Sequence, residues 1–163
     1  MSKYRKNVGI VVFNHNRKVL LCARADKKSN QWQFPQGGID NEEDIIDAAR
    51  RELHEETGIS SVELVATILE PLRYDFPKQI FKNFLKKGSP YVGQEQFWVL
   101  FYFCGNDEEI DFCTNPQEIE FKAYEWADIE EAPKRIVNFK KEVYQKVVQN
   151  FAPYIQDKEI QYG

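Results

Sequence analysis

The chain has 163 residues, of which 42% are apolar, and its 22 Lys and Arg against 26 Asp and Glu give a net charge of −4. That apolar share can offset the entropy of ordering, which excludes a disordered chain, and the length suits one domain with a substantial core. The negative charge excludes binding of duplex DNA through a global basic field, so any polyanion must be held by local basic residues or through a metal.

The N-terminal residues, MSKYRKN, lead into only a short apolar run, and no apolar stretch reaches the roughly 18 residues of a membrane span. We therefore expect a cytoplasmic protein with no membrane partner. Cys22, Cys104 and Cys113 lack the spacing of a metal site. Since Cys22 and Cys104 lie in strand-like runs, we expect buried, reduced thiols.

The first part of the chain reads as short β-type pieces. Asn14 and Asn16, between the first two apolar runs, predict a hairpin turn. Pro35 keeps the residues that precede it extended, because the residue before a proline disfavours the helical conformation. Gly37 and Gly38 predict a sharp turn that brings backbone carbonyls near the following helix. The predicted pieces are strands at 8–13 and 18–23, a polar loop at 25–30 and an extended piece at 31–34.

Residues 37–59 (GGIDNEEDIIDAARRELHEETGI) end in a helix signal, with Gly58 in the position that commonly closes a helix. Positions i, i+3 and i+4 share one helix face, so Glu52, Glu55 and Glu56 are predicted to project from one patch. The apolar stripe beside that patch, which would pack on a core, consists of Ile46, Ala49 and Leu53.

Three glutamates on one helix face repel one another, at about 0.2–0.5 kcal/mol per i,i+4 pair. A hard divalent cation compensates such a patch, and Mg²⁺ commonly takes one or two carboxylates together with substrate phosphate. Arg51, four residues before Glu55, can pair with that carboxylate and orient it. The alternative is an ordinary solvated acidic face.

The rest of the chain mixes strands and helices. Residues 78–93 (KQIFKNFLKKGSPYVG) form a basic segment, either a solvated face or the rim of a polyphosphate site, and 96–104 (QFWVLFYFC) read as a central strand covered on both faces. The other predicted pieces are strands at 62–69 and 73–76, an acidic loop at 105–115 and a weakly alternating run at 118–126 that contains Glu120.

Two helices are predicted near the C-terminus. Asp128 and Glu131 resemble a capping box for a short helix, and Asn138 can cap a long one that Pro153 ends. The whole pattern predicts an α/β fold with a mixed sheet, and nothing divides the chain into separate units.

The helix segment also carries a longer motif. Gly37, Glu43, the run 51–53 (REL), the pair 55–56 (EE) and the pair 58–59 (GI) match the Nudix box at every defined position. The chain thus resembles the Nudix hydrolases, which implies an α/β/α sandwich and a single Nudix domain over residues 1–163 with its box at 37–59.

The resemblance extends beyond the box to one branch, the bacterial RNA pyrophosphohydrolases and related dinucleoside polyphosphate hydrolases. It is carried by residues 32–40 (WQFPQGGID), 74–77 (YDFP), 93–94 (GQ), 120–121 (EF) and 139–144 (FKKEVY). Glu95 departs from the branch, because it stands where a basic residue is usual. If Glu95 faced the substrate, its charge would weaken polyphosphate binding.

The resemblance implies roles for particular residues. Val137 and Phe139 would cradle a base, although Phe139 can equally be a helix-packing residue. The proton acceptor would be Glu55, Glu56 or Glu120, with Arg51 assisting. The implied ligands of Mg²⁺ or Mn²⁺ are Glu52, Glu55, Glu56, Glu120 and the Gly37 carbonyl, and the implied phosphate contacts are Arg24, Arg73 and Lys140.

Three functions follow as hypotheses. The first is a metal-dependent hydrolase that removes pyrophosphate from the 5′ end of triphosphorylated or diphosphorylated RNA, a step in mRNA decay. The second is cleavage of dinucleoside polyphosphates such as diadenosine tetraphosphate. The third, a non-catalytic nucleotide-binding module, is disfavoured because the box is complete.

Overall fold

The fold is centred on two long neighbouring strands. In the computed structural model, which describes residues 3–26 and 31–162, β1 (Lys3–Phe13) lies parallel to β7 (Tyr91–Phe103), in a register that pairs Val8 with Phe97 and Phe13 with Tyr102. Residues 8–13 of β1 and 97–103 of β7 are almost continuously apolar, as expected of parallel strands covered on both faces, whereas the first part of each strand contains several polar residues. The predicted central strand is confirmed, and it begins five residues earlier than expected.

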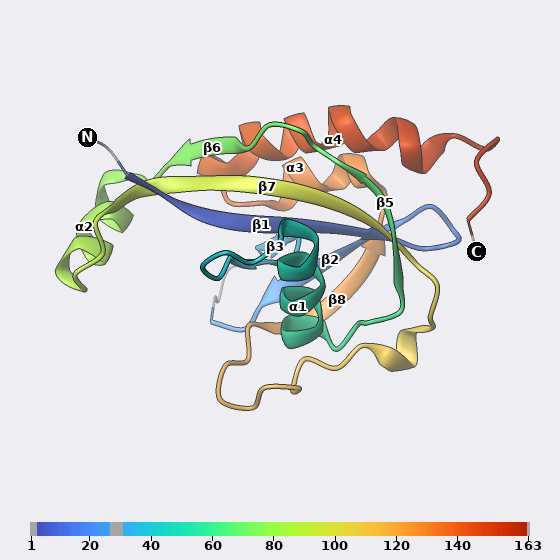
Figure 1. Ribbon diagram of the computed structural model, residues 1–163, viewed down its shortest axis with the longest axis horizontal. Coiled ribbons are helices and arrows are strands. Elements are labelled where there is room, and N and C mark those ends of the chain that lie inside the picture. The colour runs from blue at the N-terminus through green and yellow to red at the C-terminus, as the bar shows by residue number, and fades with distance from the viewer. Residues whose placement is uncertain (1–2, 27–30, 163) are drawn as a thin grey trace.

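The described residues form one eight-stranded mixed sheet whose main path runs β3-β2-β1-β7-β5, with β4 paired to β1, β6 to β7 and β8 to β2 (Figure 1). The β1–β2 hairpin is present as predicted. The remaining strands are β2 (Val19–Arg24), β3 (Trp32–Gln33), β4 (Gln36–Gly38), β5 (Val62–Thr67), β6 (Leu72–Asp75) and β8 (Phe121–Ala127).

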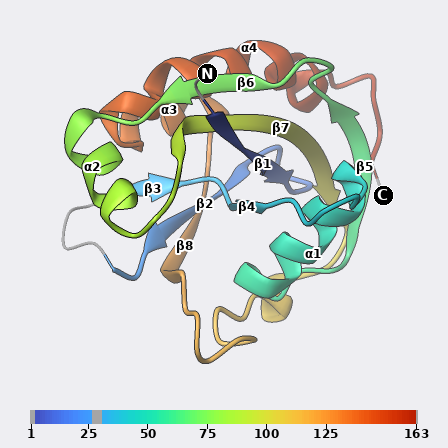
Figure 2. The same cartoon turned by 60° about the vertical axis from the view of Figure 1, so that its left-hand side comes forward.

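Helices cover both faces of this sheet, so the α/β sandwich is confirmed (Figure 2). Side chains alternate along each strand: Val11 and Phe13 face the layer that contains α4, whereas Val8, Ile10 and Val12 face α1. The helices are α1 (Ile45–Thr57), α2 (Lys78–Lys86), α3 (Ala132–Arg135) and α4 (Lys141–Gln156), with 3₁₀ turns η1 (Asp107–Glu109), η2 (Ile129–Glu131) and η3 (Asn138–Lys140). Within the described ranges, no helix has the length and apolarity needed to cross a membrane.

Several local predictions were wrong. Pro153 lies inside α4, which continues to Gln156 because Phe151 and Ile155 on either side of the proline are both buried. Cys104 is exposed, since β7 ends one residue before it. The basic segment 78–93, for which no helix was predicted, contains α2. The polar loop at 25–30 stays a prediction, because most of it lies outside the described residues.

The two predicted caps near the C-terminus were also wrong. Asp128 makes no side-chain capping bond and instead pairs with Lys18, so the predicted capping box does not form. Asn138 opens η3, and α4 itself begins only at Lys141.

Leu53 tests how firmly α1 is held on the sheet. Its side chain is fully buried, whereas that of the adjacent His54 is exposed. Leu53→Ala should therefore lower the free energy of unfolding by about 2–5 kcal/mol in a denaturant titration. The control His54→Ala should change it by no more than about 0.5 kcal/mol. Equal effects of the two substitutions would contradict this packing of α1.

Candidate active site

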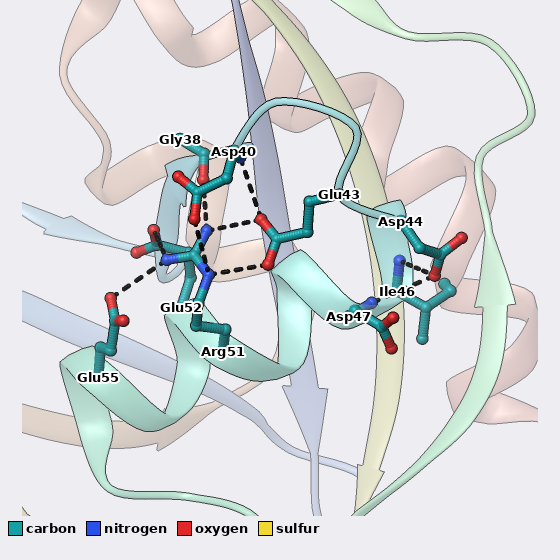
Figure 3. Close-up of polar contacts among 9 residues, drawn as sticks. All are labelled: Gly38, Asp40, Glu43, Asp44, Ile46, Asp47, Arg51, Glu52 and Glu55. Atoms are coloured by element: carbon teal, nitrogen blue, oxygen red, sulfur yellow. Dashed lines mark hydrogen bonds and ion pairs between the residues drawn. The ribbon is translucent and has the colours of Figure 1, made fainter.

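The helix α1 is fixed at both ends by local interactions. The Asp44 carboxylate accepts hydrogen bonds from the backbone N–H groups of Ile46, at 3.0 Å, and Asp47, at 3.3 Å (Figure 3). At the other end, Gly58 has φ of 78° and donates its N–H to the His54 carbonyl at 2.8 Å. Gly58 thus closes the helix as predicted, because a left-handed residue there favours glycine. The glutamates of α1 project from a firmly placed helix.

Arg51 lies at the centre of the polar contacts around α1 (Figure 3). Its guanidinium binds both carboxylate oxygens of Glu43 at 2.9 Å and donates to the Gly38 carbonyl at 2.9 Å. It also donates to Glu52 at 2.7 Å and to Glu55 at 3.3 Å, so the expected pairing with Glu55 is present. Arg51 therefore joins the strand β4, the loop that carries Glu43 and the acidic face of α1.

These hydrogen bonds from Arg51 are the main reason that the pKa of Glu43 falls to about 2. Glu43 also accepts a hydrogen bond from the Asp40 N–H at 3.0 Å. Glu43 therefore remains ionised across the physiological range and keeps the Arg51 guanidinium in place beside the other glutamates.

Glu56 is in a different environment from the other glutamates of α1. Its Oε2 atom is buried and has no hydrogen-bond partner. Burial raises the pKa of Glu56 well above its ordinary value, and the charges of Glu52 and Glu120 raise it further; only the backbone N–H of Gln36 favours the ionised form by hydrogen bonding. A buried carboxylate that is repelled by two others is costly unless a cation compensates it.

Gly37 allows β4 to approach α1 closely. A Cβ atom at Gly37 would fall 2.0 Å from the carboxylate of Glu52, and one at Gly38 would fall 2.6 Å from the Arg5 guanidinium. Both glycines lie in a strand paired with β1, so the predicted sharp turn was wrong. Gly37 is needed for space, because any side chain there would displace Glu52.

A cavity of about 610 Å³ lies beside the carboxylates. It brings together most of the residues expected to act on substrate: Gly37, Glu52, Glu55, Glu56, Glu120, Arg24, Lys140 and Phe139. Arg24 is oriented there by Asp26, to which its Nε and one terminal nitrogen donate at 3.0 and 2.8 Å. The cavity thus presents carboxylates and cations together, a combination suited to a metal-bound polyphosphate.

Arg73, Val137 and Arg51 do not line this cavity. Arg73 lines an adjoining cavity of about 370 Å³, lies over the Tyr4 ring at 4.8 Å and pairs with Glu95 at 3.8 Å. Glu95 does not line the larger cavity, so its negative charge does not face the site that holds the glutamates. Val137 packs against the core cluster beneath α4.

Sequence reasoning missed a polar floor on the strands β1, β4 and β7. Gln96 Nε2 donates to Asn7 at 2.9 Å and to Gln36 at 2.8 Å, and the Tyr74 hydroxyl donates to Gln94 at 2.8 Å. The signal was available, because polar residues inside an apolar strand point to a site. Other lining residues assigned no role there are Arg5, Gln33 and Glu118. Lys87 also lines the cavity, and it belongs to the basic segment for which the rim of a polyphosphate site was one of the two alternatives.

The donor set suits a hard divalent cation, since it consists of carboxylates and includes the unpartnered oxygen of Glu56. As the side chains lie, the described residues contain no group of three or more His, Cys, Asp or Glu placed to hold an ion. Glu52 and Glu55 instead accept hydrogen bonds from Arg51. Ligation by all three glutamates would therefore require Glu52 and Glu55 to turn from Arg51 toward Glu56.

Comparison with known proteins identifies the class. Residues 3–147 match the family described as the NUDIX domain, so the chain belongs to the Nudix family and is a Nudix hydrolase. Hydrolases of this family generally use divalent metal ions. The E. coli dihydroneopterin triphosphate pyrophosphohydrolase shares the fold, with a TM-score of 0.66, 18% identity and coverage of 90% of this chain and 98% of that one. A C. elegans Ap4A hydrolase also shares the fold, with a TM-score of 0.61 and 19% identity, and the match covers 91% of this chain and 98% of that one.

More similar relatives carry a more particular name. The chain is 45% identical over 157 residues to the RNA pyrophosphohydrolase of Bartonella henselae, covering 91% of this chain and 90% of the relative. It is 43% identical over 150 residues to the RNA pyrophosphohydrolase of Caulobacter vibrioides, and this match covers 91% of this chain and 86% of the relative. The chloroplastic Nudix hydrolase 27 of Arabidopsis thaliana is 41% identical to the chain over 158 residues, and the match covers 96% of this chain and 69% of the relative.

Lys140 provides a pH test of the cavity. Its side chain is buried, and burial, with a further contribution from Arg24, lowers its pKa to about 8. Between about pH 8 and its ordinary value of 10.5 the unfolded chain binds the proton and the folded chain does not, so stability rises with pH across that window. Lys140→Met should be more stable than the parent at pH 7, by roughly 3 kcal/mol.

Urea titrations at several pH values measure this difference, which should shrink as the pH approaches 10.5. The matched control is Lys141→Met, at the exposed neighbouring position, which should stay within about 0.5 kcal/mol of the parent throughout. A difference between Lys140→Met and the parent that does not vary with pH would contradict a buried, destabilised ammonium.

Proposed function

We propose that this chain is an RNA pyrophosphohydrolase, which hydrolyses the 5′ phosphoanhydride of triphosphorylated or diphosphorylated RNA and leaves a 5′ monophosphate. The proposal rests chiefly on Glu56, whose buried oxygen has no partner and lies in a cavity that also presents Arg5, Arg24 and Lys140. Carboxylates beside cations fit a polyphosphate bound with a metal. The relatives named RNA pyrophosphohydrolase support RNA as its carrier.

In this proposal Mg²⁺ or Mn²⁺ is held by Glu52, Glu55, Glu56, Glu120 and the Gly37 carbonyl. When bound, the ion would neutralise charge on the phosphates and make a coordinated water more acidic. Glu55, Glu56 or Glu120 then takes the proton of the attacking water. Arg51 would hold Glu52 and Glu55 by hydrogen bonds until the ion binds, and it does not line the cavity.

The basic residues hold the phosphates in this proposal. Arg24, braced by Asp26, and Lys140, destabilised by burial, would each gain from the approach of an anion, and Arg5 adds a third positive charge. Arg73 serves instead to neutralise Glu95. We further propose that residues 1–163 act as one domain in the cytoplasm and that the reaction contributes to mRNA decay.

Glu56→Gln tests the proposed metal role. The substitution should reduce hydrolysis of triphosphorylated RNA at least about 100-fold. Without metal the variant should be at least as stable as the parent, because a buried charge is removed. Addition of Mg²⁺ should raise the Tm of the parent but not of the variant, and a chelator should stop the reaction of the parent. The control Glu63→Gln, at an exposed position on β5, should behave as the parent. Full activity of Glu56→Gln would refute the metal role.

The choice of substrate is tested by turnover on two ligands. Triphosphorylated RNA should be cleaved with a higher kcat/KM than diadenosine tetraphosphate, because RNA offers further nucleotides to the cavity. Release of pyrophosphate and of adenosine phosphates can be followed by chromatography on the same enzyme preparation. A large excess for diadenosine tetraphosphate would favour the dinucleoside polyphosphate hydrolase instead.

A further inference from the structure

A row of four aromatic rings lies along the cavity on the side of α2 and β6. The ring centroids of Phe84 and Phe76 are 5.0 Å apart, those of Phe76 and Tyr74 are 6.0 Å apart, and those of Tyr74 and Phe139 are 5.7 Å apart. All four rings line the cavity that holds the glutamates. The row joins the consecutive elements β6 and α2 to η3, which comes much later in the chain.

The helix α2 is unusual because it contributes no buried residue to the core. It stands at the end of the sheet beside β6 and β7 (Figure 1). Ile80, Asn83 and Phe84 line the cavity from this helix, and Lys87 does so from its C-terminal end. Phe84 is 38% exposed although it is stacked on Phe76. An apolar helix face directed at a polar cavity is suited to a flat apolar group of a ligand.

The remainder of the cavity indicates the rest of that ligand. Arg5, Arg24 and Lys140 are cations suited to phosphates, and Lys140 follows Phe139 directly in the chain. A ligand with phosphates at one end and a planar ring at the other is a nucleotide. Phe76 and Phe84 lie at the opposite end of the aromatic row from Phe139, at a place suited to a base further from the reacting phosphates.

We propose that a nucleobase of the RNA substrate stacks on Phe84, which is itself stacked on Phe76, and that α2 is thereby a base-binding wall of the active site. This inference rests on the proposed function. Stacking on aromatic rings tolerates every base, because each base has a π-face. Lys87 meets the negatively charged backbone next to that base. The wall makes the enzyme bind RNA more tightly than a free nucleoside triphosphate, without strict dependence on sequence.

Phe84→Ala tests the wall, with triphosphorylated RNA trinucleotides that carry all bases or lack the base at position 1, 2 or 3. With the complete trinucleotide, the substitution should raise KM about tenfold and leave kcat unchanged, because stacking binds the substrate without touching the reacting atoms. For the parent enzyme, removal of the one base that stacks should raise KM by a similar factor. Phe84→Ala should then cause no further rise with that abasic trinucleotide. Phe84→Trp should retain the parent KM.

Leu85→Ala is the matched control, because Leu85 is 55% exposed on the same helix and does not line the cavity. It should leave KM unchanged for every trinucleotide. If Phe84→Ala raises KM equally for complete and all abasic substrates, or not at all, the base-binding wall is refuted while the proposed function stands. If the parent enzyme cleaves none of the trinucleotides, the proposed function fails, and this inference fails with it.

Discussion

The structure depends on one unfavourable feature, the buried carboxylate oxygen of Glu56 beside Glu52 and Glu120. Desolvation of an ionised carboxylate costs several kcal/mol, and its like-charged neighbours add to that cost. A buried carboxylate oxygen beside two other acids serves no packing purpose that an apolar side chain would not serve better. A divalent cation that binds these carboxylates and the phosphates of a substrate would compensate this cost. Membership of the Nudix family leads one to expect such a cation.

The surrounding contacts hold this unfavourable feature in place. Arg51 joins Gly38, Glu43, Glu52 and Glu55 in one network, and Gly37 leaves the space that Glu52 occupies. Side chains of different kinds line different parts of the cavity, with acids on α1, cations beside them and aromatic rings toward α2. A polyphosphate carried by a flat base matches that order, so in the proposed function one cavity serves both catalysis and recognition.

Local sequence patterns were sufficient to predict the strands and helices whose apolar residues recur at one regular spacing. The hairpin, the central strand and α1 with its closing Gly58 follow from alternation or from the helical repeat. The Nudix box supplied the glutamates, although no local rule reveals that, among the glutamates of α1, it is Glu56 that has a buried oxygen without a partner. That property arises because Gln36 and Glu120 come from other parts of the chain. The packing role of Gly37 escaped prediction for the same reason. The amide floor and α2 were missed although the sequence carries their signals, which are polar residues inside an apolar strand and apolar residues at helical spacing.

The most direct test of the account is a calorimetric titration of the metal-free protein with Mn²⁺, carried out on the parent and on Glu56→Gln. If Glu56 binds the ion, the parent should take up Mn²⁺ saturably and the variant should bind it at least about tenfold more weakly, because the buried oxygen that lacks a partner is then no longer charged. Equal uptake by both proteins, or none by the parent, would contradict the account.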